Sequence, residues 1–152
     1  MNLAAYLKAN SARHQFIEKP TTHHADEASR ASGIPITNIA KTIVFVDPEE
    51  RPVIAVVRGD RMVSRHKLEA CSGMHKLRIA SDTLAEKVTG YPTGGIPPVG
   101  HRRRSPVFLD TEIASLGTVW CGGGTRTRLV NLATADIVRL AGATTCDISV
   151  PG

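Results

Sequence analysis

The chain has 152 residues, a length that suits one domain around a single core. Hydrophobic residues make up 41% and charged residues 22%, and no stretch approaches the roughly 20 apolar residues that a membrane helix needs, so the composition indicates a globular protein without a membrane partner. The net charge of +5 favours a polyanion as a partner without establishing one.

Residues 2–11 predict a first helix, because Leu3 and Leu7 share one side of it. The N-terminus lacks the basic start and long apolar run of a signal peptide, so we expect a cytoplasmic protein. A polar passage at 20–24 precedes a predicted short helix at 25–32, which Gly33 ends.

The middle of the chain predicts a hairpin followed by two capped helices. Apolar segments on either side of a polar turn predict strands at 39–46 and 52–57. The helices expected next are 64–72, capped by Ser64, and 82–89, capped by Ser81, with a short strand at 76–80 between them.

The rest of the chain begins with an irregular segment at 91–100, which holds three prolines and three glycines. Strands are predicted at 106–110, 117–121, 128–132 and 146–150, and a helix capped by Thr134 at 135–141. Strands and helices are mixed without regular alternation. The fold class expected is therefore α+β, with a mixed, largely antiparallel sheet in a single domain over 1–152.

The three cysteines are widely spaced and odd in number. They form neither a C-x-x-C pair nor a set with zinc-ligand spacing. We therefore expect Cys71, Cys121 and Cys146 to be free thiols, and we expect no metal and no cofactor.

Lys41 is unusual because it lies in a strand whose two faces are both nearly apolar. Such a strand is expected at the centre of a sheet, where a lysine is desolvated unless an anion or hydrogen-bond acceptors satisfy it. The alternative is that the ammonium reaches solvent from a strand end. Residues alone leave both interpretations open.

A glycine- and proline-rich loop at 94–100 could present fixed backbone groups to a ligand, although an ordinary rigid turn has the same composition. The loop continues into His101 and three arginines, which could bind phosphates or form a solvated charged run. A second glycine-rich turn at 122–128 carries two more arginines and lacks the Lys-Ser/Thr ending of a P-loop. His23 and His24 could act as bases, but paired loop histidines are more often surface residues, and Asp110 is expected to cap a turn.

Three segments in this order resemble the YbaK/ProX family, which includes the editing domain inserted in some bacterial prolyl-tRNA synthetases. They are DEASRASGIP at 26–35 leading into IAKTIVFV, then GYPTGGIPPVGH at 90–101 with the family's G-x-x-x-P spacing at Gly94 and Pro98, and finally VFLDTEI, VWCGGG and LVNLATADIVRLAGA. The resemblance covers roughly residues 20–148.

The resemblance implies a barrel-like sheet flanked by helices and a site for the aminoacylated 3′ end of tRNA. The residues that it implies for catalysis are Lys41, Gly94, Gly95, Ile96, Pro97 and Pro98. Those expected to bind the substrate are Thr42, His24, Gly100, His101, Gly122 and Gly123. Arg102, Arg103, Arg104, Arg126 and Arg128 are the candidates for contact with the body of the tRNA.

The function that follows is trans-editing hydrolysis of a mischarged aminoacyl-tRNA carrying a small amino acid such as Ala, Ser, Thr or Cys, with tRNA-Pro as the expected tRNA. An aminoacyl-tRNA synthetase is a further candidate partner, and DNA is not one. Gly122 and Leu129 stand where some cysteinyl-tRNA deacylases of the family carry polar residues, which argues against a mechanism that uses a cysteine thiol of the substrate. Two alternatives are a non-catalytic module that binds aminoacyl-tRNA or a small ligand, and a structural RNA-binding protein, for which aromatic residues are few.

Overall fold

The computed structural model describes residues 1–152. The helices are α1 (Leu3–Ala9), α2 (Ala25–Ser32), α3 (Arg65–Ser72), α4 (Asp82–Thr89), α5 (Thr111–Ala114) and α6 (Thr134–Ala141), with a 3-10 turn η1 (Ile36–Asn38). The strands are β1 (His14–Glu18), β2 (Ala40–Val46), β3 (Pro52–Arg58), β4 (Arg61–Val63), β5 (Arg78–Ile79), β6 (Val107–Asp110), β7 (Thr118–Gly122), β8 (Arg128–Ala133), β9 (Thr144–Cys146) and β10 (Ser149–Pro151).

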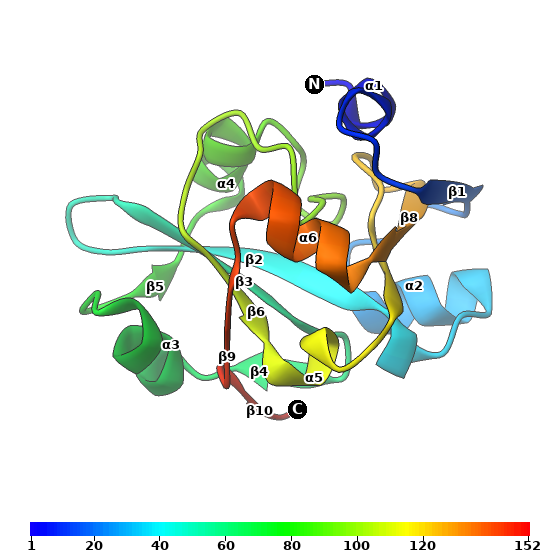
Figure 1. The fold of residues 1–152 in the computed structure, drawn as a ribbon. Coiled ribbons are helices and arrows are strands. Elements are labelled where there is room, and N and C mark those ends of the chain that lie inside the picture. Colours follow the sequence, from blue (N-terminus) through cyan, green and yellow to red (C-terminus); the bar gives the residue numbers. More distant parts are fainter.

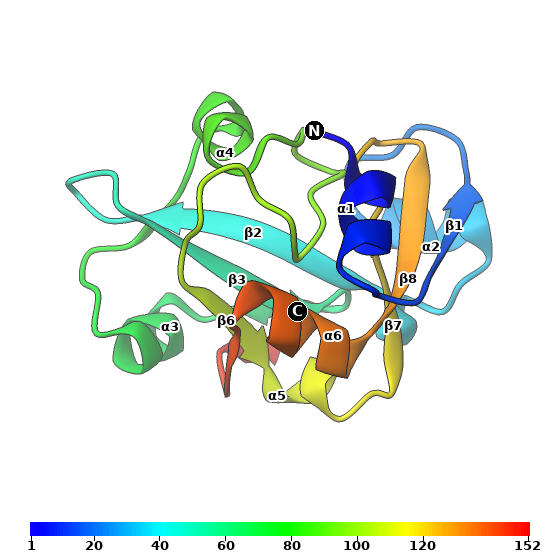
Figure 2. The same ribbon diagram turned by 45° about the horizontal axis from the view of Figure 1, so that its top comes forward.

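The strands form three sheets. The largest has the order β5-β2-β3-β6-β9, in which β2 pairs antiparallel with β3 and the β3–β6 and β6–β9 pairs are parallel. A second sheet, β1-β8-β7, is antiparallel and lies at the opposite end of the molecule from α3 and β5 (Figures 1 and 2). The α+β class with a mixed, largely antiparallel sheet is confirmed, and the sheets do not close into a barrel.

The hairpin of β2 and β3 separates two apolar clusters, because side chains alternate between the faces of a strand. Val44, Val46 and Val56 face the larger cluster of 21 buried residues, which α1, α4 and α6 also enter. Phe45 and Val57 face a smaller cluster that α3 covers. The connection between α4 and β6, residues 90–106, runs over the hairpin between α4 and α1 (Figure 2).

Local signals account for several helix boundaries. The hydroxyls of Ser64 and Ser81 accept hydrogen bonds from the N–H groups of Lys67 and Leu84, as the predicted caps require. The prediction for Thr134 was wrong: Ala133 holds the cap position, and the Thr134 hydroxyl instead donates to the Leu116 carbonyl at 2.6 Å.

Most of the elements that sequence patterns missed are short. No prediction was made for β1, β4 or α5, and the strand predicted at 146–150 is two strands, β9 and β10. β4 and β10 pair with each other and have only three residues each, too few for an alternating pattern to be visible.

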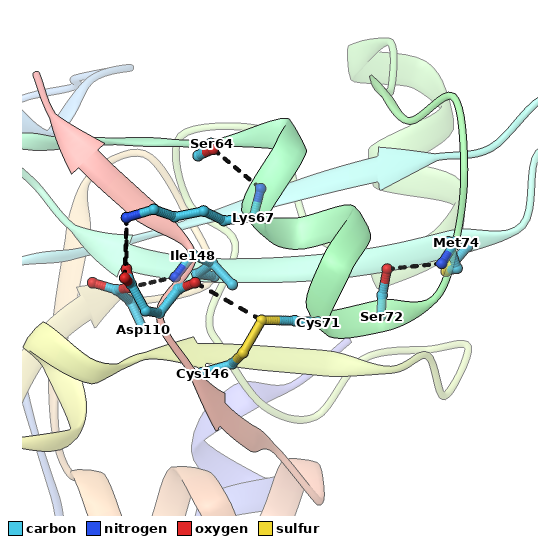
Figure 3. The surroundings of a disulfide bond; sticks show 9 residues. Ser64, Lys67, Cys71, Ser72, Met74, Asp110, Cys146 and Ile148 are labelled. Carbon is cyan, nitrogen blue, oxygen red and sulfur yellow. Dashed lines mark hydrogen bonds and ion pairs between the residues drawn. A yellow bond between two sulfur atoms is a disulfide. The ribbon is translucent and has the colours of Figure 1, made fainter.

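The prediction of three free thiols was wrong for two of them. Cys71 at the end of α3 and Cys146 at the end of β9 form a disulfide, with their Cα atoms 6.6 Å apart (Figure 3). Nothing in a spacing of 75 residues could indicate this pair, because the fold brings α3 over β9. Cys121 is free and buried, as predicted.

Candidate functional site

β2 lies between β3 and β5 in its sheet, as predicted, but β5 pairs only with Phe45 and Val46. Lys41 is the second residue of β2 and pairs with Val57 of β3, so it lies near a strand end, as the alternative had it. The side chain is half-buried and makes no hydrogen bond or ion pair within the chain. Burial lowers the pKa of Lys41 below its ordinary value, and the carboxylates of Asp60 and Asp26 partly oppose this effect. The ammonium is therefore an unpaired cation in a partly desolvated place.

Strand β7 brings Gly122 next to Lys41. Ile39, just before β2, forms a parallel bridge with Trp120 of β7. Lys41 and Gly122 each lie two residues farther along the chain than this bridged pair. Because side chains alternate between the faces of a strand, Lys41 lies on the same face as Ile39, and Gly122 on the same face as Trp120. The two strands stay close along this stretch.

The predicted loop lies on Gly122. A Cβ atom at Gly122 would be only 2.5 Å from the Ile96 carbonyl oxygen, so the loop backbone occupies the space over this glycine. The Gly124 N–H also donates to the Gly95 carbonyl at 2.8 Å. The loop backbone therefore packs on the end of β7, the strand that runs beside the start of β2, where Lys41 lies.

The turn before α2 forms another side of this region. Gly94 has a φ of 90°, and a Cβ atom there would lie 3.1 Å from the Cα of His23. His24 is the exposed N-cap residue of α2, and its N–H donates to the Glu27 carboxylate at 3.1 Å. The turn therefore contacts the loop at Gly94. Asp26, in the first turn of α2 that follows, is one of the two carboxylates that oppose the lowering of the Lys41 pKa.

Two backbone N–H groups within residues 94–98 of the loop have no partner in the chain. The Gly95 N–H donates to the Pro92 carbonyl at 2.9 Å, whereas those of Gly94 and Ile96 donate no hydrogen bond. Pro97 has no N–H to offer. The N–H groups at 94 and 96 are therefore the free donors within residues 94–98.

His101 is bonded to the backbone of the loop. Its Nε2–H donates to the Pro97 carbonyl at 2.6 Å, and burial lowers the pKa of the ring. Gly100 is packed against Tyr6 of α1, with a φ of 74°. Both residues shape the loop, and the substrate contact predicted for them stays a prediction.

Thr42 and Gly123 lie close to the loop: Ala40 and Val44, on the same face of β2 as Thr42, share a buried cluster with Ile96, and Gly123 lies between two glycines that contact the loop. Alternation along β2 points Thr42 to the face opposite Lys41, where its Oγ1 is buried without a partner. The Gly123 N–H donates to the Arg128 carbonyl at 3.0 Å, which closes the turn between β7 and β8.

The predicted RNA-binding arginines are spread over the surface. Arg102, Arg103 and Arg104 are exposed. Arg126 donates through Nε to the Thr93 carbonyl at 2.7 Å, beside the loop. The Arg128 guanidinium lies over the Phe16 ring, 4.1 Å from its centroid, and is the least free of the five.

Lys19 is a residue that the patterns did not single out. Its buried ammonium donates to the Thr22 hydroxyl at 2.6 Å and to the Arg126 carbonyl at 2.7 Å. It thereby ties the turn before α2 to the turn between β7 and β8, both of which touch the 94–98 loop. A lysine in an irregular polar passage gives no periodic signal, so only the tertiary structure shows this role.

No group of three or more His, Cys, Asp or Glu side chains is placed to hold a metal ion. None of the helices has the length and apolar character that crossing a membrane requires.

The chain and its fold match a known class of domain. The aminoacyl-tRNA editing domain family matches residues 19–140, and the chain belongs to this family. The match contains Lys41, the 94–98 loop and Gly122.

Particular relatives place the chain more closely. It is 38% identical over 97 residues to a proline–tRNA ligase of Nitratidesulfovibrio vulgaris, a match that covers 64% of this chain and 17% of the ligase. It is 29% identical over 125 residues to "Putative Cys-tRNA(Pro)/Cys-tRNA(Cys) deacylase EbsC" of Enterococcus faecalis, covering 82% of this chain and 76% of that protein. The solved structure of "a putative trans-editing enzyme for prolyl tRNA synthetase" superposes with a TM-score of 0.83 at 28% identity, over 99% of both chains.

Proposed function

We propose that the chain is a cytoplasmic, single-domain trans-editing deacylase that hydrolyses the ester bond of mischarged aminoacyl-tRNA. The expected substrates carry a small amino acid such as Ala, Ser, Thr or Cys on tRNA-Pro. The observation that carries the proposal is the unpaired Lys41 ammonium beside a loop with two free N–H donors. The names of the E. faecalis relative and of the superposed structure support the same activity.

The arrangement suits ester hydrolysis, because an ester is an activated acyl compound and positioning with oxyanion stabilisation can suffice. The N–H groups of Gly94 and Ile96 would donate to the carbonyl oxygen as it gains charge. Lys41 would bind the terminal phosphate or ribose and orient the ester. Water supplies the nucleophile, and no side chain is assigned as its base.

The test is a panel of labelled aminoacyl-tRNAs, with Ala, Ser, Thr, Cys and Pro each charged on tRNA-Pro. The purified protein should accelerate loss of one or two mischarged species over spontaneous hydrolysis. Lys41→Ala should reduce the rate constant by at least about 100-fold, a typical effect of losing one transition-state contact. Lys8→Ala, at an exposed lysine of α1, is the matched control and should leave it unchanged.

The second candidate is a module of the same fold that binds aminoacyl-tRNA without turnover, which the same free cation and donors would serve. Retained tRNA binding with no acceleration of any species in the panel would reject the deacylase in favour of this module.

A further inference from the structure

A hollow, called the second hollow below to keep it apart from the region around Lys41, lies at the other end of β2 from Lys41. It has a volume of about 510 Å³ and is bounded by the β2–β3 turn, the segment after α3 and the segment before β6. Lys41 and Asp47, the nearest lining residue of the turn, are six residues apart, or about 20 Å along an extended strand. The hollow is therefore separate from the region around Lys41.

Unpaired cations rim this hollow. Lys76, Arg103 and Arg104 line it, and their side chains make no hydrogen bond or ion pair within the chain. Arg51 also lines it but is held by the Asp47 carboxylate at 2.7 Å. The two acidic residues of the lining, Asp47 and Glu49, both lie within 4 Å of Arg51, so the three other cations remain free for an external anion.

The lining also offers apolar surface. Pro48, Pro52, Pro106 and Met74 contribute to the hollow between the cations. The backbone of Lys76 is strained, because its φ of 53° is a left-handed conformation that lysine rarely adopts. Cations around an apolar floor match a phosphate next to a ribose or base.

The arginine run connects this hollow to the region around Lys41. The N–H groups of Arg102 and Arg103 donate to the carbonyls of Thr89 and Val88, each at 2.9 Å, and fix the run on the end of α4. Arg102 lines a different hollow of about 370 Å³ together with Arg126, which bonds the Thr93 carbonyl next to the loop. Arg126, Arg102 and the cations of the second hollow thus follow one another from the segment before the loop, with Asp82 and Glu86 also lining the smaller hollow.

We propose that the second hollow holds a backbone phosphate of the same RNA whose 3′ end lies at Lys41. This inference rests on the proposed function. A separation of about 20 Å along β2 spans several stacked nucleotides, so the phosphate would lie several nucleotides from the terminal adenosine. This contact would therefore fix the position of the tRNA acceptor end without depending on its base sequence.

The test measures equilibrium binding of uncharged tRNA-Pro against salt concentration, for the unaltered chain and for Lys76→Gln, Arg103→Gln and Arg104→Gln. Loss of one phosphate contact should lower the slope of log K against log salt by about 0.7–0.9, which corresponds to roughly five- to eight-fold weaker binding at 0.1 M salt. Arg13→Gln is the matched control, because Arg13 is exposed, unpaired and outside the hollow. Unchanged affinity and slope in all three variants, with melting curves that show intact folding, would overturn the inference.

Two further measurements separate the sources of the phosphate and the two proposals. Adenosine monophosphate and inorganic phosphate are titrated against the same variants, and a loss of nucleotide affinity without loss of tRNA affinity would overturn the RNA assignment in favour of a free nucleotide. Hydrolysis of an aminoacyl ester of adenosine, which cannot reach the hollow, reports on the proposed function alone. Rapid turnover of this ester together with unaltered tRNA binding by the variants would reject the hollow and retain the deacylase.

Discussion

At the scale of the residue, Lys41 is expected to destabilise the fold while it serves the proposed hydrolysis of the ester. Burial lowers its pKa, so the charged form is disfavoured in the folded state. Lys41→Met keeps most of the side-chain volume and removes the charge. We expect it to raise the free energy of unfolding by about 0.5–1 kcal/mol, as stabilising changes at functional sites often do, while deacylation is lost. Urea unfolding and the aminoacyl-tRNA assay on one preparation measure both, and a destabilised variant would contradict this account of Lys41.

His101 gives a prediction for pH. Burial lowers its pKa below the ordinary value of 6.5, although its hydrogen bond to the Pro97 carbonyl opposes the effect. As the pH falls below 6.5, the unfolded chain takes up this proton before the folded chain does. The free energy of unfolding must therefore fall with pH in that range. Melting temperatures between pH 7.5 and pH 5 should show a smaller decline in His101→Gln than in the unaltered chain, and equal declines would count against the contribution of His101.

At the scale of the element, the close contact between β7 and the 94–98 loop is open to a direct test. Gly122→Ala would place a methyl group 2.5 Å from the Ile96 carbonyl oxygen, so the loop must move. A displacement of the order of 1 Å from a productive geometry costs about 100-fold in rate. Gly117→Ala is the control, since nothing lies within 4 Å of a Cβ atom there. Equal deacylation rates for the two variants would show that the loop does not need its present position.

Particular helices and strands show how much of the structure could be predicted from the sequence. The helix at 25–32 and the helix at 82–89 have the predicted bounds, because polar caps and terminal glycines mark both ends of each. Lys41 and the 94–98 loop were predicted as parts of one site; the structure packs the loop on Gly122 of β7, the strand beside β2, and the common site stays a prediction. Thr42 could not be assigned to a face relative to the loop, because that requires knowing which side of β2 the loop covers.

At the scale of the whole molecule, contacts between residues far apart in the sequence produce features that no local sequence pattern predicts. Lys19 meets the Arg126 carbonyl across 107 residues of chain, and its position between two turns depends on the β1–β8 pairing. The second hollow likewise collects residues from three separate segments. Charge patterning identified the arginine run, but only the fold shows that Arg102 and Arg103 line different hollows.

The Cys71–Cys146 disulfide gives the last prediction at the molecular scale. It closes a segment of 75 residues between α3 and β9, and such a cross-link stabilises mainly by restricting the unfolded chain. Cys71→Ser/Cys146→Ser should lower the free energy of unfolding by about 2–4 kcal/mol relative to the oxidised chain. Reduction of the unaltered chain should lower the free energy of unfolding equally, and the reduced chain and the variant should then unfold at the same denaturant concentration.

The bond joins α3 and β9, away from the β1-β8-β7 sheet that Lys41 adjoins, so deacylation by the folded variant should be unchanged. A variant as stable as the oxidised chain would show that the bond does not stabilise this fold, and a loss of activity at full folding would couple α3 to the region around Lys41.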